Sequence, residues 1–204
     1  MSRFIPRIAL NILLTCALLL TSLPTIFTPQ KIRAQNSSPD FDFTHLTTAD
    51  NDLPIPSSSV QQTASLILDI DKDGVNDFVI ASRRPPPGPS LVWYRRTIDD
   101  WERYVIDSEP LDIEAGGDYW DIDGGGDLDI VMGGDSRSNQ IWWWENPAPN
   151  FSPNTEWTRR LIKNSGGNKH HDQIFGDFTG DGKVELAFWN QYAGLSNGQV
   201  RIIE

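Results

Sequence analysis

Three nine-residue stretches of this chain place oxygen-bearing side chains at a spacing that suits a hard cation. They are residues 69–77, 121–129 and 177–185, and each has an acidic residue at positions 1 and 9 and a glycine at position 6. A calcium ion takes six to eight oxygen ligands, which a loop supplies from alternate side chains and a backbone carbonyl, with a glycine at the sharp turn. The spacing therefore predicts three calcium loops.

The three stretches differ in the ligands they offer. The second has Gly125 at position 5, so we expect it to be the weakest site, with Asp127 or a water compensating. An Asp- and Gly-rich stretch can also be a solvated turn, but three copies in register favour calcium. The expected ligands, with the carbonyl at position 7 included, are Asp69, Asp71, Asp73, Val75, Asp77, Asp121, Asp123, Asp127, Asp129, Asp177, Thr179, Asp181, Lys183 and Glu185.

The residues after each stretch indicate what the loops connect. Apolar triplets follow directly, at residues 78–80, 130–132 and 186–188. An EF-hand loop instead closes with a glutamate at position 12 and joins two helices. These loops close earlier and run into short apolar segments, so we expect each of them to join two strands.

The acidic stretches recur with a period of somewhat over fifty residues. Asp69 and Asp121 are 52 residues apart, and Asp121 and Asp177 are 56 apart. Other landmarks move with them: Trp-led segments at 101–106 and 157–162, and apolar or aromatic segments at 91–94, 141–144 and 199–202. Each period therefore reads as four short strands, a pattern typical of propeller blades. We predict an all-β fold of about three four-stranded antiparallel β-propeller blades.

The loops, the lead-in at residues 174–178 and the period resemble the FG-GAP and VCBS repeat proteins, which include the propeller blades of integrin α-subunits. The resemblance covers about residues 41–204. It implies a β-propeller, usually seven-bladed, with Ca²⁺ on the loop between the first two strands of some blades. The family motif is matched in full by Asp69, Asp71, Asp73 and Asp77, with a gap by Asp121, Asp123 and Asp129, and with conservative changes by Asp177, Thr179, Asp181 and Glu185.

The number of periods predicts an incomplete or truncated propeller. Residues 60–204 hold the repeats and have room for about three blades, whereas closed propellers have four to eight. An N-terminal segment, residues 35–59, contains a strand-like stretch at 41–48 that resembles the Trp-led strands. We expect this strand to complete the last blade, or the chain to be half of an assembly. Exposed blade edges would favour self-association.

Residues 1–34 have the parts of a secretory signal. Arg3 and Arg7 precede an apolar run at 8–23 that is shorter than the ~20 residues of a spanning helix. We expect cleavage after Ala34 and a secreted, periplasmic or cell-surface protein with no membrane span in the mature chain; an uncleaved anchor is the alternative. Cys16, the single cysteine, leaves with the signal, so calcium rather than a disulfide would stabilise the mature chain.

The charge of the mature chain narrows its partners. Residues 1–34 carry four of the 17 Lys and Arg and none of the acids, which leaves 13 basic residues against 28 Asp and Glu. So acidic a chain disfavours nucleic acid and anionic membranes as partners. A protein or a polysaccharide remains the expected ligand.

Candidate catalytic groups gather at one place. His170, His171 and Asp172 precede the third acidic stretch and could act as a general base or bind a transition metal. Adjacent strand residues face opposite ways, however, so polar packing at a strand end is the alternative. The run 142–144 of three tryptophans should likewise place Trp143 on one face and its neighbours on the other, which favours core packing over a sugar-binding platform.

These features favour a binding module over an enzyme. We expect a secreted calcium-binding repeat protein in which calcium is structural and the surface binds a protein or polysaccharide. The alternative is an exported carbohydrate-active enzyme, similar to a propeller-type polysaccharide lyase, with a site near His170–Gln173.

Overall fold

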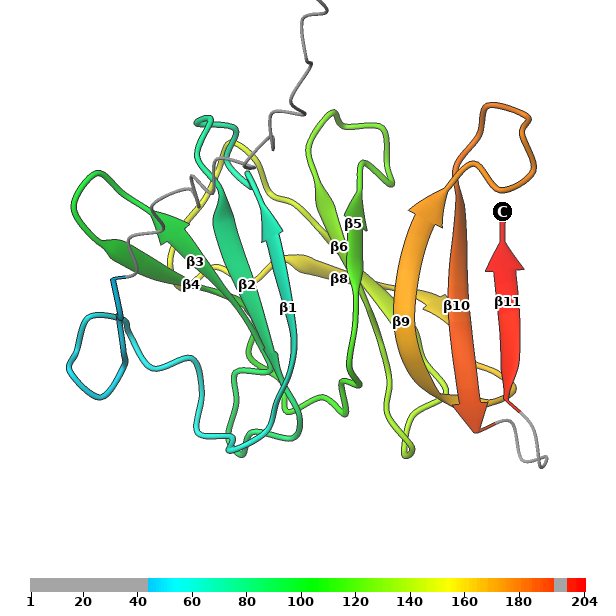
Figure 1. Cartoon of the computed structure of the whole chain (residues 1–204), viewed down its shortest axis with the longest axis horizontal. Coiled ribbons are helices and arrows are strands. Elements are labelled where there is room, and N and C mark those ends of the chain that lie inside the picture. The colour runs from blue at the N-terminus through cyan, green and yellow to red at the C-terminus, as the bar shows by residue number, and fades with distance from the viewer. Residues whose placement is uncertain (1–43, 193–197) are drawn as a thin grey trace, which may run out of the picture. The chain divides into compact units, whose positions relative to one another are not determined.

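The computed structural model describes residues 44–192 and 198–204, and the expected signal at 1–34 lies outside these residues. Within the described part the chain forms eleven strands and no helix (Figure 1). The first sheet has the order β1-β2-β3-β4, with antiparallel neighbours throughout. Its strands are β1 (Gln62–Leu68), β2 (Asp77–Ser82), β3 (Leu91–Arg96) and β4 (Trp101–Asp107).

The next two sheets repeat this plan. The second has the order β5-β6-β7-β8 and the third the order β9-β10-β11, again antiparallel. Their strands are β5 (Asp118–Trp120), β6 (Asp129–Gly133), β7 (Ile141–Glu145), β8 (Thr158–Lys163), β9 (Asn168–Gly176), β10 (Glu185–Tyr192) and β11 (Gln199–Ile203). The predicted all-β fold of propeller-like blades is confirmed.

Each predicted acidic loop joins the first and second strands of its sheet. Residues 69–76 lie between β1 and β2, 121–128 between β5 and β6, and 177–184 between β9 and β10. Figure 1 shows the three loops at the same end of the strands. The ninth residue of each stretch is also the first residue of the following strand.

Two apolar layers hold the sheets together. Residues of the first and second sheets form the larger core, whose fully buried side chains include Trp93 and Trp144. A smaller core joins the second and third sheets around Val131, Leu186 and Phe188. Trp143 packs against this smaller core while its two neighbours lie in the larger one, so the predicted alternation of the three tryptophans is confirmed.

The segment before β1 differs from the expectation. Residues 44–59 form turns and bends without a strand, and residues 41–43 of the expected strand lie outside the described part. Thr47 and Asp52 explain the difference, because side chains that bond to nearby backbone compete with strand pairing. The Asp52 carboxylate accepts the N–H of Thr47 at 3.0 Å, and the Thr47 hydroxyl accepts the N–H of Ala49 at 2.8 Å.

Residues just after this turn contact the first sheet, not the third. The phenol of Tyr94 donates to the carbonyl of Pro54, and the guanidinium of Arg103 donates to that of Pro56 at 3.3 Å. The described part of the N-terminal segment therefore does not supply the expected fourth strand of the third sheet. No helix in the described ranges is long and apolar enough to cross a membrane.

Candidate metal loops

One hydrogen bond recurs at the start of every acidic loop. The carboxylate at position 1 accepts the backbone N–H of the glycine at position 6, at 2.9 Å, 3.0 Å and 2.9 Å in the three loops. These glycines, Gly74, Gly126 and Gly182, have φ angles of 89°, 88° and 84°, a region that L-residues with a side chain rarely adopt. Each loop is therefore folded back on its first aspartate, as a cation-binding loop requires.

A second hydrogen bond recurs at the end of every loop. The position-9 carboxylates of Asp77, Asp129 and Glu185 accept the N–H of position 2, at 3.4 Å, 2.9 Å and 2.7 Å. All three carboxylates are buried, with exposed fractions of 2%, 0% and 2%. The three loops thus share one hydrogen-bonding frame despite their different sequences.

Three carboxylate groups come together in each loop. Oxygens within 4.8 Å of one another belong to Asp69, Asp71 and Asp73; to Asp121, Asp123 and Asp129; and to Asp177, Asp181 and Glu185. Asp77 lies outside the first group, and its carboxylate accepts the N–H groups of Ile70 and Arg96. Asp127 lies outside the second. The hydroxyl of Thr179 contacts Glu185 at 3.2 Å, and Val75 and Lys183 would contribute only backbone carbonyls.

The three carboxylate groups could hold a metal ion, and the second loop also has an unmet bonding site. Burial raises the pKa of Asp77 and of Asp129 to about 6, and burial with neighbouring aspartates also raises the pKa of Asp127. In the second loop Oδ1 of Asp121 is buried without a hydrogen-bond partner. A buried carboxylate oxygen without a partner is costly, and a hard cation is the ligand such an oxygen prefers.

The second loop has no side-chain ligand at position 5, and a lysine of the first loop lies beside it. Gly125 stands at position 5, and the ammonium of Lys72 from the first loop donates to the carbonyl of Gly126. The positive charge of Lys72 also acts to lower the pKa of nearby Asp127. The structure thus places the first loop's lysine against the loop that has no side-chain ligand at position 5.

Two contacts around the loops have no signal in the sequence pattern. The buried side-chain amide of Asn146 donates to the carbonyls of Ile70 at 3.3 Å and Leu128 at 3.1 Å, so one residue bonds to both the first and the second loop. The guanidinium Nε of Arg95 lies 2.5 Å from Oδ2 of Asp71. Both partners are distant in the sequence, and only the fold brings them together.

The two adjacent histidines occupy different environments, as predicted for neighbours on a strand. The His170 ring is fully buried, with Nε2 2.9 Å from the Lys163 ammonium and Nδ1 3.1 Å from the carbonyl of Gly134. Because the ammonium can only donate, the proton of this imidazole lies on Nδ1. Burial, with the positive charge of Lys163, lowers the pKa of His170 to about 4. His170 is therefore an interior group that cannot reach a substrate.

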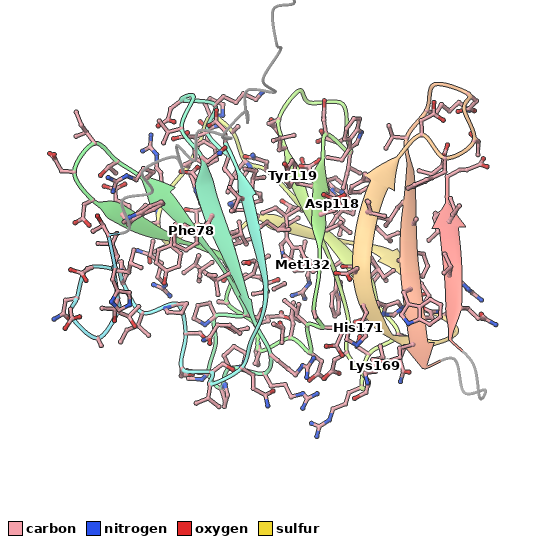
Figure 2. The ribbon with its side chains drawn as sticks, viewed as in Figure 1. Phe78, Asp118, Tyr119, Met132, Lys169 and His171 are labelled. Carbon is pink, nitrogen blue, oxygen red and sulfur yellow. The ribbon has the colours of Figure 1, made fainter. Side chains whose placement is uncertain are left out.

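His171 is the more accessible of the pair. Its side chain is 37% exposed, and its Nε2 lies 4.0 Å from Oε2 of Glu114, in the segment between β4 and β5. Asp172 is exposed, with a φ angle of 51°, and lies at the irregularity in the pairing of β9 with β10. Figure 2 shows His171 toward the end of β9 that is far from the acidic loop.

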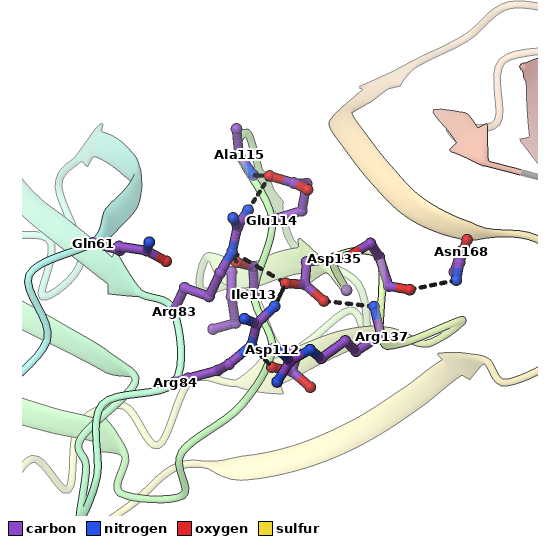
Figure 3. Close-up of polar contacts among 12 residues, drawn as sticks. Gln61, Arg83, Arg84, Asp112, Ile113, Glu114, Ala115, Asp135, Arg137 and Asn168 are labelled. Atoms are coloured by element: carbon purple, nitrogen blue, oxygen red, sulfur yellow. Dashed lines mark hydrogen bonds and ion pairs between the residues drawn. The ribbon is translucent and has the colours of Figure 1, made fainter.

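An ion-pair network at that far end joins the first two sheets (Figure 3). Arg83 and Arg84, which follow β2, pair with Glu114 and Asp112 respectively, and both contact the buried carboxylate of Asp135. Arg83 also donates to the carbonyl of Ile113 at 3.2 Å. Each of these charges is paired with an opposite charge, so the network does not offer a free reactive group.

A groove lies between the second and third sheets beside their acidic loops. It has a volume of about 480 Å³, and its lining includes Trp120, Phe175, Val184 and the loop residue Asp121. The Trp120 side chain is 44% exposed, and its ring centroid is 6.4 Å from that of Phe175. The sequence pattern did not single out Trp120 as an exposed residue beside an acidic loop, because residue 120 is not part of any segment that recurs in the three periods.

The fold and the loops together define a class: all-β repeat proteins whose antiparallel sheets each begin with an acidic loop between the first two strands. Residues 121–188 match the family model described as FG-GAP-like repeat. This stretch runs from the start of the second loop into the strand after the third loop, and within it the predicted resemblance to FG-GAP repeats is confirmed. The resemblance to VCBS repeats and its extent over residues 41–204 stay predictions. No curated protein matches the chain.

Proposed function

We propose that the protein is a calcium-binding repeat module in which Ca²⁺ stabilises the blades and the surface binds a ligand. The observation that supports this proposal is the shared hydrogen-bonding frame of the three loops, with three carboxylates converging in each of them. The ion would be held by those carboxylates and by the carbonyls at position 7. When bound, it would neutralise the charge that the fold concentrates in each loop.

Calcium should act on stability, because the position-9 carboxylates start the second strand of each sheet. A ligand that binds only the folded state stabilises it, by about 2.7 kcal/mol for one site at a hundredfold excess over its Kd. Extracellular calcium would suffice even for weak sites, and FG-GAP repeats suit an exported protein. Secretion through residues 1–34 remains a prediction, since these residues lie outside the described part.

The test is a thermal melt with millimolar Ca²⁺ and again with a chelator. We expect a large rise in Tm with Ca²⁺ and a smaller one with Mg²⁺. Asp69→Asn should reduce the rise, while Asp99→Asn, at an exposed aspartate in the β3–β4 turn, should leave it unchanged. A Tm that is the same with Ca²⁺ and with chelator would overturn the proposal.

The ligand surface we favour is the groove at Trp120 and Phe175. An exposed tryptophan ring and a half-buried phenylalanine ring beside acidic oxygens suit a polysaccharide, with a protein as the other expected class. Titration of candidate polysaccharides against Trp120→Ala and the parent chain tests this assignment. If the Trp120→Ala variant binds as tightly as the parent chain, the ligand binds at another surface.

The enzyme alternative rests on His171 alone, since His170 is interior. The partly exposed imidazole next to the Glu114 carboxylate is the candidate general base at this end of β9. His171→Ala should leave the calcium-dependent melt intact in either case. Loss of polysaccharide cleavage in this variant alone would establish the enzyme, and absence of any cleavage by the parent chain would exclude it for the polysaccharides tried.

A further inference from the structure

The third sheet has an apolar face that nothing in the described part of the chain covers. Its inner face lies in the smaller core, through Leu186 and Phe188. The opposite side, which we call the open face, consists of Ile174, Ala187, Trp189, Val200 and Ile202. Ile174, Val200 and Ile202 are 56%, 69% and 52% exposed. Such a contiguous exposed apolar surface is uncommon on an isolated soluble protein and indicates a binding surface.

The strand register makes this face continuous. Ala187 pairs with Ile174 on one side and with Ile202 on the other, and Trp189 pairs with Val200. Side chains directly opposite each other in antiparallel strands lie within contact distance. Trp189 and Val200 also line a hollow of about 260 Å³ together with His171. Figure 1 shows β11 as the outermost strand of this sheet.

The open face corresponds to surfaces that are covered in the other two sheets. Counted from the acidic loops, Ala187 and Ile202 occupy the places of Val79 and Trp93 in the first sheet and of Val131 and Trp143 in the second. Val79 and Trp93 pack in the larger core, between the first and second sheets. Val131 and Trp143 pack in the smaller core, between the second and third sheets. The same side of each sheet thus receives the next sheet.

The first sheet carries the counterpart. On its outer side β1 and β2 present Ser65, Ile67 and Ile80, which we call the outer face, and the Ile67 side chain is 67% exposed. A hollow of about 270 Å³ lies against Ser65 and Ile80. In the second sheet the place of Ile80 is taken by Met132, which is fully buried against the first sheet. On the β3–β4 part of this side Pro54 and Pro56 bond to Tyr94 and Arg103, and Val92 and Tyr94 are buried. The outer face is therefore the β1–β2 part.

We propose that a second copy of this chain lays its outer face on the open face, head to tail, and that two such contacts close one ring. The chain carries both halves of a sheet-to-sheet contact that it already makes twice internally. Head-to-tail contacts form closed rings when the rotation between copies permits. Two copies bring together six sheets, a number within the range of closed propellers. The contact is apolar and is separate from the acidic loops, so it does not depend on the proposed calcium function.

Sedimentation velocity of the calcium-supplemented chain over a range of concentrations tests the proposal. We expect a dimer that does not grow further. Ile202→Asp, on the open face, and Ile67→Asp, on the outer face, should each give a monomer. An equimolar mixture of the two variants retains one intact contact and should form a weaker dimer. Ile98→Asp is the matched control, since Ile98 is 93% exposed in the β3–β4 turn and lies on neither face.

Several results would overturn the proposal. They are a monomeric parent chain at tens of micromolar, a series of ever longer species, a mixture that stays monomeric, or an Ile98→Asp variant as impaired as the others. Near-ultraviolet circular dichroism shows whether an aspartate variant has lost its fold. In that case Ile67→Thr and Ile202→Thr, which keep the branched shape suited to a strand, should each weaken the dimer about tenfold. An unchanged dimer Kd would contradict the contact.

Discussion

The ammonium of Lys163, at the end of β8, donates to Nε2 of His170 in β9 over 2.9 Å, deep between the second and third sheets. The same ammonium donates to the carbonyls of Asn139 at 2.7 Å and Gly167 at 2.8 Å. All three of its hydrogens are thus used, and the imidazole is held neutral. Protonation of His170 would set two cations against each other in the interior.

This pair predicts a loss of stability in mild acid. The pKa of His170 is about 4 in the folded chain and about 6.5 when unfolded. Because the unfolded chain binds the proton more tightly, the contribution of neutral His170 to the free energy of unfolding is complete above pH 6.5. This contribution is lost as the pH falls through 4. The loss amounts to about 3 kcal/mol at most. Urea unfolding between pH 7 and pH 4.5 measures it.

His170→Gln is the matched variant for this measurement, because its carbonyl can still accept from Lys163. It should be less stable at pH 7 but show a shallower decline with acid. Asp77 and Asp129 have raised folded pKa values, so their contribution has the opposite sign, being lost as the pH rises through 6. Comparison of variant with parent cancels that contribution. Equal slopes in the two proteins would refute the role of His170.

Gly125→Asp should strengthen calcium binding at the second loop. It restores a carboxylate at position 5, where Asp73 and Asp181 stand in the other loops. The φ angle of Gly125 lies outside the left-handed region, and the nearest atom to an added Cβ is Oδ1 of Asp123, the end of a flexible side chain. We expect at least a tenfold lower Kd for this site by isothermal titration calorimetry. Unchanged affinity would mean that position 5 of this loop does not contribute a ligand.

The glycines of the second loop should differ in their tolerance of a side chain. Gly126→Ala places an L-residue at a φ angle of 88° and should cost about 1–2 kcal/mol of unfolding free energy, although nothing lies within 4 Å of the new Cβ. Gly125→Ala in the same loop is the control and should cost less. Chemical denaturation of both variants compares them, and equal losses would show that backbone strain is not the cause.

Asn146→Ala should destabilise the first two sheets together. The substitution leaves the carbonyls of Ile70 and Leu128 without the amide that donates to both. Loss of buried hydrogen bonds of this kind costs about 1–3 kcal/mol. We also expect the calcium-dependent rise in Tm to shrink, since two loops lose a common support. Asn154→Ala, at an exposed asparagine, serves as the control. A variant with the parent's melt at every calcium concentration would contradict this role.

The sequence predicted the parts of the fold that depend on local pattern. The loop positions at 69–77, 121–129 and 177–185 and their flanking strands follow from side-chain spacing, which is a local property. Asn146 and Arg83 meet their partners only because one sheet packs on another. Their contacts therefore could not be predicted from the spacing of residues in the sequence. The segment at 44–48 failed as a strand because Thr47 and Asp52 bond within their own turn.

The ninth residue of each acidic loop has a consequence for where this protein can mature. Asp77, Asp129 and Glu185 each end a loop and begin a strand, so on the proposed function the arrival of the ion and the alignment of the strand are one event. In a calcium-poor compartment the strands of a nascent chain would pair incompletely, and the chain would be sensitive to proteases. On the proposed function, folding would be completed only where calcium is available. The calcium concentration of the surrounding medium would thus determine what fraction of the chains folds and escapes proteolysis.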